Sequence, residues 1–376
     1  MPLNIEALRA EFPVTQSYIY LNHAAVAPIS ISVQRAMNQQ VRDVTLHGIV
    51  HSDRWENTYR RTRRVAAQLI HAKPSEIAFI KNTTEGIQIV ANGIKWKRGD
   101  NVVITDRGFP ANVYPWINLK SRGVETRFAP ETDGRIAMEQ LFDLVDKNTR
   151  IISISSVEFA SGFRHDLTQI GEFCTKNGIL FFVDAIQSLG ALNLNVAKSH
   201  IDFLSADAHK WLLGPEGAGV FYCAKKAMRH LHVNNLGWAS VKNPGDYLSY
   251  DPTPLPNAQR FESGTLNTAG IYGLKACLDF IQRIGIENIE SRILMLTDQL
   301  VAGLKEKGYD VLSSRKPDEK SGIVSFSHPR IKRDTLFQCL HNKQVICALR
   351  GNGIRLSPHV YNTEEEIDHV LNILPE

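Results

Sequence analysis

Short apolar runs alternate with amphipathic stretches through the first two thirds of the chain. Apolar runs of this kind, bounded by turn residues, predict strands buried on both faces of a sheet. They lie at 77–80, 101–105, 150–159, 179–183 and 220–222. The intervening stretches carry apolar residues at helical spacing and predict helices. This alternation of strand and helix predicts an α/β fold with a doubly wound, mainly parallel sheet.

The last third of the chain has a different pattern. An irregular stretch rich in Asn, Gly and Pro, residues 233–257, precedes a helix that begins at Thr268 and a long helix over 288–307. Shorter strands and helices follow, which predicts a smaller α+β unit. We expect a large domain over 26–285 and a small domain over 286–376, with residues 1–25 joining the small domain.

Composition narrows the class of protein. The chain has 376 residues, a formal net charge of +4 and 43% hydrophobic residues, and its basic residues are spread along the sequence. This argues against a nucleic-acid partner, and no apolar run approaches the length of a membrane span. The five cysteines form no CxxC pair, which argues against disulfides and a metal site. The N-terminus lacks the apolar core of a signal peptide, so we expect a cytoplasmic protein.

An acid and an amine follow two of the predicted strands. Asp184 ends the apolar run 179–183, and the segment 201–206 leads into Asp207 and then Lys210. Open α/β sheets bind ligands at the carboxyl ends of their strands, so both groups are expected at one edge. A lysine beside a buried acid is typical of enzymes that use pyridoxal phosphate (PLP). The lysine forms a Schiff base with the cofactor, and the acid pairs with its ring nitrogen.

Two further strand ends carry candidate ligands. Thr83 and Thr84 open a helix directly after the strand 77–80, where free N–H groups and hydroxyls favour a phosphate. A plain helix cap with Glu85 in the first turn explains the same residues equally well. Phe109 follows the strand 101–105 and either stacks on a ring or fills the core.

Several motifs in this order resemble the class V aminotransferase and cysteine desulfurase family of fold-type I PLP enzymes. The resemblance covers nearly the whole chain. It rests on Thr83-Thr84-Glu85, the strand end 183–187, His209-Lys210 followed by 214–217, the segment 260–268, and 354–357 ahead of 361–363.

The resemblance implies roles for the residues around the ring of PLP. Lys210 corresponds to the Schiff-base lysine, which also acts as general acid and base. Asp184 corresponds to the partner of the ring nitrogen, and Gln187 to the donor to the phenolic oxygen. Phe109 lies where the family places an aromatic side chain that stacks on the ring.

The resemblance also implies a phosphate site built from two chains. Thr83, Thr84 and His209 would bind the phosphate, and Thr265 of a second subunit would complete the site. We therefore expect a homodimer with shared active sites. Asp207 stands where relatives carry a phosphate-binding serine, so we expect it in the cofactor site. A carboxylate there would repel the phosphate, unless it instead orients His209.

A small amino acid is the substrate that the resemblance implies. Arg355 corresponds to the arginine that holds the substrate carboxylate in a bidentate contact. Asn22 and His23 lie in an N-terminal loop that lines the substrate side in relatives.

The chain departs from cysteine desulfurases near Arg355. Those enzymes carry a catalytic cysteine on a loop before this arginine, whereas residues 350–353 read Arg-Gly-Asn-Gly. We interpret the nearby Cys347 as a core residue. The expected reaction is therefore β-elimination or C–S lysis. Transamination is the alternative reaction, followed by epimerase-like and kynureninase-like reactions. The non-enzymatic alternative is a protein of the PLP fold that has lost catalysis and serves as a binding or regulatory subunit.

Overall fold

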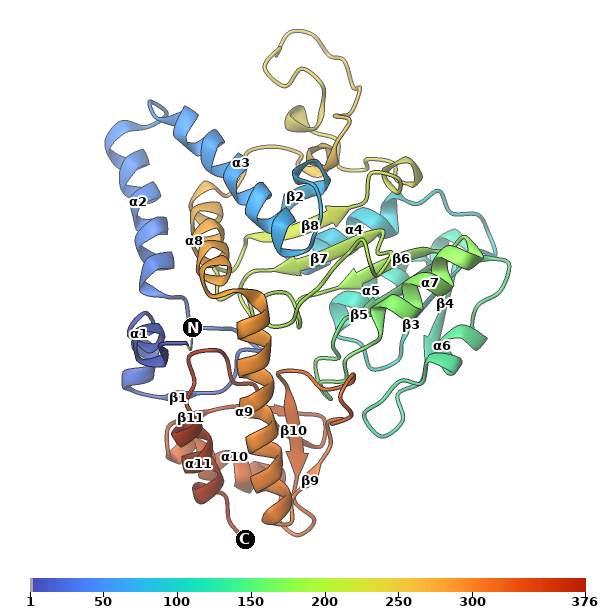
Figure 1. Ribbon diagram of the computed structural model, residues 1–376. Helices are drawn as coiled ribbons and strands as arrows, with labels where there is room; N and C mark the ends of the chain where they lie inside the picture. The colour runs from blue at the N-terminus through green and yellow to red at the C-terminus, as the bar shows by residue number, and fades with distance from the viewer. Residues whose placement is uncertain (1–2) are drawn as a thin grey trace.

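The computed structural model describes residues 3–376 and confirms the predicted α/β fold. A large sheet surrounded by helices forms the upper part of the molecule in Figure 1, and a smaller α+β unit lies below it. Between residues 3 and 376, no helix is both long and apolar enough to cross a membrane.

The α-helices occupy the intervals expected between the strands, with ends that differ by a few residues. Their bounds are α1 Ile5–Ala10, α2 Ile31–His47, α3 Ser52–Leu69, α4 Thr83–Gly93, α5 Tyr114–Ile117, α6 Met138–Asp143, α7 Leu167–Asn177, α8 Thr268–Ile284, α9 Ile286–Glu306, α10 Arg333–Asn342 and α11 Glu364–Ile373. Side-chain caps explain several starts: Ser30, Asp166 and Thr363 each accept a backbone N–H from the first turn of the helix that follows, as their residue types predict.

Seven strands form the large sheet in the order β2-β8-β7-β6-β5-β3-β4. Within this sheet β8 is antiparallel to both of its neighbours, and the other pairs are parallel. The bounds are β2 Ile77–Ile80, β3 Asn101–Thr105, β4 Glu125–Ala129, β5 Thr149–Ser155, β6 Leu180–Asp184, β7 Phe203–Asp207 and β8 Gly219–Cys223. Because the parallel strands point the same way, the residues that follow them meet at one edge.

The small unit contains a four-stranded sheet in the order β12-β13-β10-β9. Its bounds are β9 Asp310–Val311, β10 Val324–Ser327, β12 Ala348–Arg350 and β13 Gly353–Leu356. The pattern at 344–349 predicts one strand, but the structure has two, β11 (Val345–Ile346) and β12. The strand is divided because β11 pairs with the N-terminal strand β1 (Ile19–Tyr20), whereas β12 pairs with β13.

The N-terminal segment is tied to the small unit by this β1–β11 pairing and by a bridge between Asn22 and Ser357. Leu21 belongs to the hydrophobic core of the small unit. Ile289 and Ile293 of α9, however, belong to the core of the large sheet. The core thus crosses residue 285, and the domain boundaries expected from the sequence stay a prediction.

Candidate active site

The carboxyl ends of the parallel strands bring most of the candidate residues to one edge of the large sheet. Asp184 ends β6 and Asp207 ends the neighbouring β7, with Asp184 paired in register with Ser205. Phe109 follows β3. The loop after β5 carries Phe159, whose ring meets the Phe109 ring edge-on with centroids 5.3 Å apart.

Asp184 is buried in this edge. Its Oδ1 accepts the backbone N–H of Ile186 at 3.1 Å. Burial raises its pKa to about 6, while that hydrogen bond and the charge of Lys210 act in the opposite direction. A carboxylate in such surroundings gains most from a cationic partner, because the partner compensates for the lost hydration.

Lys210 lies just beyond β7 on the same edge. Burial lowers its pKa to about 8, opposed by Asp184 and assisted by Arg355. A substantial fraction of the amine is therefore neutral near pH 8, and only the neutral amine is nucleophilic. Its Nζ lies 5.5 Å from the centre of the Phe109 ring. Phe109 is 43% exposed, so part of its ring is free to contact a ligand.

The start of α4 is fixed against β7. Asn82, not a threonine, caps this helix, and the Thr83 hydroxyl accepts the backbone N–H of Asp207 at 3.1 Å. The Ser205 hydroxyl donates to the Thr83 carbonyl at 3.0 Å. A Cβ on Gly86 would lie 2.3 Å from that Ser205 hydroxyl, so the close approach requires glycine. Thr84 is half-buried beside Thr83, and phosphate binding by the pair stays a prediction.

Asp207 and His209 face each other. Asp207 Oδ2 lies 2.9 Å from His209 Nδ1, although this contact lacks the direction of a hydrogen bond. The contact brings the carboxylate beside the imidazole, and orientation of His209 by Asp207 stays a prediction. Direct contact of either residue with a phosphate stays a prediction.

Gln187 and His23 are more constrained than their sequence positions suggest. The Gln187 amide donates to the Ala24 carbonyl at 3.1 Å and accepts from Trp211 Nε1 at 3.0 Å. His23 is fully buried, with Nδ1 2.8 Å from the Ser357 carbonyl and Nε2 2.7 Å from the Tyr361 hydroxyl. Both side chains hold the N-terminal loop in place, and direct contacts with cofactor or substrate stay predictions.

Arg355 approaches the same region from β13. Its side chain is buried, with Nη1 donating to the Phe159 carbonyl at 2.7 Å and Nη2 lying 3.5 Å from Asn22 Oδ1. Its Nε is buried without a hydrogen-bond partner among residues 3–376. A buried guanidinium is stabilised by an anionic ligand that compensates for its lost hydration. Binding of a substrate carboxylate by Arg355 stays a prediction.

Thr265 lies on the surface. It is exposed and lines a groove together with Lys81, Glu85 and Gly217. Its position next to the start of α4 places it outside the buried edge that holds Asp184. Its contribution to the site of a second subunit stays a prediction.

One buried pair near Asp184, Glu158 with His165, was not predicted from the sequence. Glu158 is fully buried after β5, and its Oε1 accepts from Thr105 at 3.2 Å and lies 3.1 Å from His165 Nε2. Its charge contributes to the raised pKa of Asp184. In the sequence Glu158 lies inside the run 150–159 that predicts a strand, so its position at a strand end was not apparent.

The arrangement fits PLP. Lys210 offers a buried amine and Asp184 a buried acid at neighbouring strand ends, the two groups that PLP requires for its aldehyde and its ring nitrogen. Phe109 offers a partly free ring, and the hydroxyl-bearing start of α4 lies at the adjacent strand end. Arg355 adds a buried guanidinium, which is the group expected to bind a substrate carboxylate. This donor set defines the class of the protein as a PLP-dependent enzyme.

The family follows from comparison with known proteins. A model of the family described as aminotransferase class-V matches residues 19–370, so the chain belongs to this family and its cofactor is PLP. It is 32% identical to a "Probable cysteine desulfurase" of Pyrococcus abyssi, over 99% of this chain and 97% of that protein. It is 28% identical to an uncharacterized aminotransferase of Bacillus subtilis, over 98% and 96% of the two chains.

Solved structures show the same fold. A cysteine desulfurase of Thermococcus onnurineus superposes with a TM-score of 0.89 at 28% identity, covering 99% of this chain and 97% of that one. A cystine C–S lyase superposes with a TM-score of 0.88 at 24% identity, over 96% and 98% of the two chains. At that lower identity the likeness concerns the fold alone.

Proposed function

We propose that this enzyme breaks the Cβ–S bond of a cysteine-like amino acid by β-elimination and uses no cysteine of its own to accept the sulfur. The observation that carries the proposal is the turn at 350–353, which joins β12 to β13 ahead of Arg355 and contains no thiol. The nearest cysteine in sequence, Cys347, is 8% exposed, and burial raises its pKa to about 12. A thiol in that state is a poor nucleophile and a poor sulfur carrier.

The residues of the chain then divide the work. Arg355 binds and orients the substrate carboxylate. The neutral amine of Lys210 takes the proton from Cα and returns it to the departing sulfur. Bound PLP, paired with Asp184, supplies the electron sink for the charge left on Cα. With cysteine and water as reactants, the balanced products are pyruvate, ammonia and hydrogen sulfide.

Several relatives are named cysteine desulfurases, which favours sulfur chemistry and makes desulfuration the rival reaction. A desulfurase transfers the sulfur to an enzyme thiol and leaves alanine, so the amino group stays on the carbon product. Transamination leaves the sulfur on the product and needs an oxo-acid acceptor. The three reactions are therefore distinguished by their products.

The decisive experiment is product analysis with purified enzyme and PLP. Cysteine and cystine are supplied in turn, without a reductant or an oxo acid, and pyruvate, alanine, ammonia and sulfide are measured. We expect pyruvate and ammonia in equal amounts. Alanine without pyruvate would overturn the proposal in favour of sulfur transfer. Turnover that appears only when an oxo acid is added in a second assay would overturn it in favour of transamination.

We also infer that the active enzyme is a homodimer in which Thr265 serves the partner's site. Large apolar side chains on the surface support association: Leu248 and Tyr250 are both 91% exposed, which is unusual for an isolated protein surface. Complementation tests the shared site. Mixed dimers of Lys210→Ala and Thr265→Ala chains regain one intact site if Thr265 acts across the dimer, and regain none if it acts within its own chain.

A further inference from the structure

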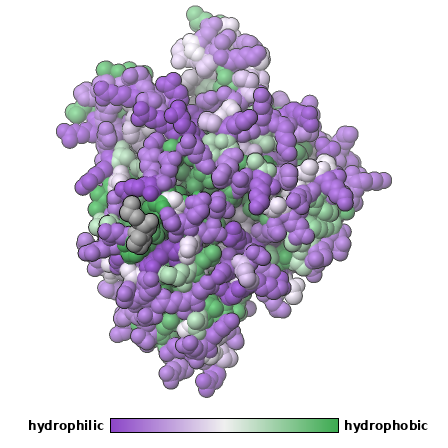
Figure 2. Space-filling model, in the orientation of Figure 1, coloured by the Kyte–Doolittle hydropathy of each residue, from purple (hydrophilic) through white to green (hydrophobic). Residues whose placement is uncertain are grey.

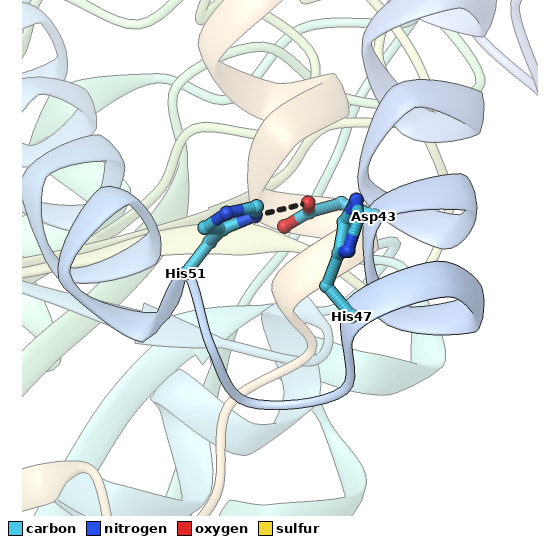
Figure 3. Close-up of side chains that lie close together, drawn as sticks. All are labelled: Asp43, His47 and His51. Carbon is cyan, nitrogen blue, oxygen red and sulfur yellow. Dashed lines mark hydrogen bonds and ion pairs between the residues drawn. The ribbon is translucent and has the colours of Figure 1, made fainter.

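The connection between α2 and α3 gathers three potential metal ligands, far along the chain from the PLP lysine. Asp43 and His47 lie near the end of α2, and His51 lies just before α3 (Figure 3). One ligand atom from each residue lies within 4.8 Å of the other two. In Figure 3 the three side chains converge on the space between the two helices.

The backbone explains why these residues meet. Asp43 and His47 are four residues apart on α2 and share one face of the helix. The chain then reverses at Gly48, where φ is +57°, a conformation that glycine adopts readily. The short return brings His51 back to Asp43, and their Nδ1 and Oδ1 atoms lie 2.6 Å apart.

A simple ion pair between Asp43 and His51 does not account for the whole cluster. The His47 ring packs against the His51 ring with centroids 4.8 Å apart. Trp55 Nε1 donates to Asp43 Oδ2 at 3.2 Å. Trp55 thereby fixes Oδ2, while the other oxygen, Oδ1, faces His51. Oriented ligands of this kind are typical of metal sites, where a neighbouring donor fixes each ligating carboxylate.

We propose that Asp43, His47 and His51 bind a divalent first-row transition metal, with Zn²⁺ as the preferred ion. Two imidazole nitrogens and one carboxylate oxygen suit zinc and leave a fourth position for water. Ligand atoms around tetrahedral zinc lie about 3.3 Å apart, so small side-chain rotations complete the site. Hard ions such as Mg²⁺ prefer oxygen ligands and are excluded by the two imidazoles.

The metal would act as a cross-link between α2 and α3. The tip that it fixes carries exposed apolar side chains, among them Leu46, Ile49 and Val50. Figure 2 shows hydrophobic surface at the upper left, where this connection lies in Figure 1. A bound ion thus holds an apolar tip in one shape, and this role is independent of the reaction at Lys210.

Calorimetric titration of the untagged holoenzyme, after removal of adventitious metal with a chelator, tests the site. We expect one Zn²⁺ per chain and a rise in the unfolding temperature, with no response to Mg²⁺. His47→Ala and His51→Ala should each weaken Zn²⁺ binding by about 100-fold or more, and Trp55→Phe by about tenfold. His369→Ala, which removes an exposed histidine from α11, is the matched control and should bind Zn²⁺ like the parent.

Two results would overturn the proposal. Zn²⁺ binding that is unchanged in both His47→Ala and His51→Ala places the ion elsewhere. If the variants lower the unfolding temperature equally with and without Zn²⁺, the three side chains stabilise the connection by their mutual contacts and not by binding a metal. Neither substitution touches the PLP residues, so activity measured in parallel reports separately on the reaction proposed above.

Discussion

Two parts of the candidate active site differ in how the chain builds them. One is the edge of the large sheet, with Asp184 and Lys210, and the other is the face of the small unit that carries Arg355, which we call the wall. The sheet edge takes its acid and amine from adjacent strand ends, β6 and β7, within one continuous stretch of the chain. The wall joins three distant segments at Arg355, which reaches the Phe159 carbonyl and Asn22. We expect the edge to hold the cofactor and the wall to orient the substrate. On that division of roles, the cofactor chemistry is encoded in one local stretch of the chain, whereas the choice of reaction is not.

The largest expected effect concerns the sheet edge. Lys210→Ala removes the anchoring amine and the proton carrier together, so turnover of every substrate should fall by at least about 10³-fold. Borohydride reduction followed by mass spectrometry should label Lys210 in the parent protein alone. Lys176→Ala, on the exposed surface of α7, is the matched control. Substantial turnover by Lys210→Ala would contradict the role assigned to this edge.

The next effect concerns the wall. Arg355→Gln removes two charged hydrogen bonds to a substrate carboxylate, which amounts to about 3 kcal/mol, so kcat/KM for cysteine should fall about 100-fold. Spectral titration should show that PLP binding is retained. Cysteamine, which lacks the carboxylate, should react equally slowly with both proteins. A loss of PLP binding would show that Arg355 also serves the cofactor, and would contradict a separate role in substrate binding.

A smaller effect follows from pH at the sheet edge. PLP uptake by apoenzyme requires neutral Lys210, whose pKa is about 8. The neutral fraction rises from about 9% at pH 7 to about 91% at pH 9, so the uptake rate should rise about tenfold. Asp184 raises the pKa of Lys210, so Asp184→Asn should shift the midpoint to lower pH. An uptake rate that is flat or falling over this range would contradict the assignment.

The smallest expected effect is at the wall. Cys347→Ser should leave the rate of pyruvate and sulfide formation unchanged, because the thiol is buried and protonated. Cys339→Ser, a half-buried thiol on α10, serves as the comparison. Sulfide formation that disappears with Cys347→Ser alone would make the wall a sulfur acceptor and favour a desulfurase.

The sequence allowed the sheet edge to be anticipated because each of its features follows a strand. Apolar runs, the acid Asp184 and the Lys210 segment are local signals, and the parallel topology brings strand ends together without further information. Glu158 lacked this signal, because it lies inside the predicted strand 150–159 and the structure ends β5 already at Ser155. Asn82 replaced the threonines as the cap of α4 for a local reason, since its carboxamide reaches the Glu85 N–H at 2.9 Å.

The wall could be anticipated only in part. The resemblance singled out Arg355 and the N-terminal loop, yet nothing in the sequence shows that Asn22 lies beside Arg355. That contact depends on the parallel pairing of β1 with β11, whose partners are separated by most of the chain. His23 is another example, because its burial depends on Ser357 and Tyr361 from the far end of the chain. Pairings between such distant short segments leave no periodic signal in the sequence.

The attachment of β1 to β11 has a consequence for motion in catalysis. Because Asn22 is bridged to Ser357, which directly follows β13, any displacement of the small unit relative to the large sheet would carry the N-terminal loop with it. In such a displacement we expect Arg355 to keep its contact with Asn22 and to lose its hydrogen bond to the Phe159 carbonyl, which belongs to the loop after β5. Arg355 and Asn22 would then move as one unit.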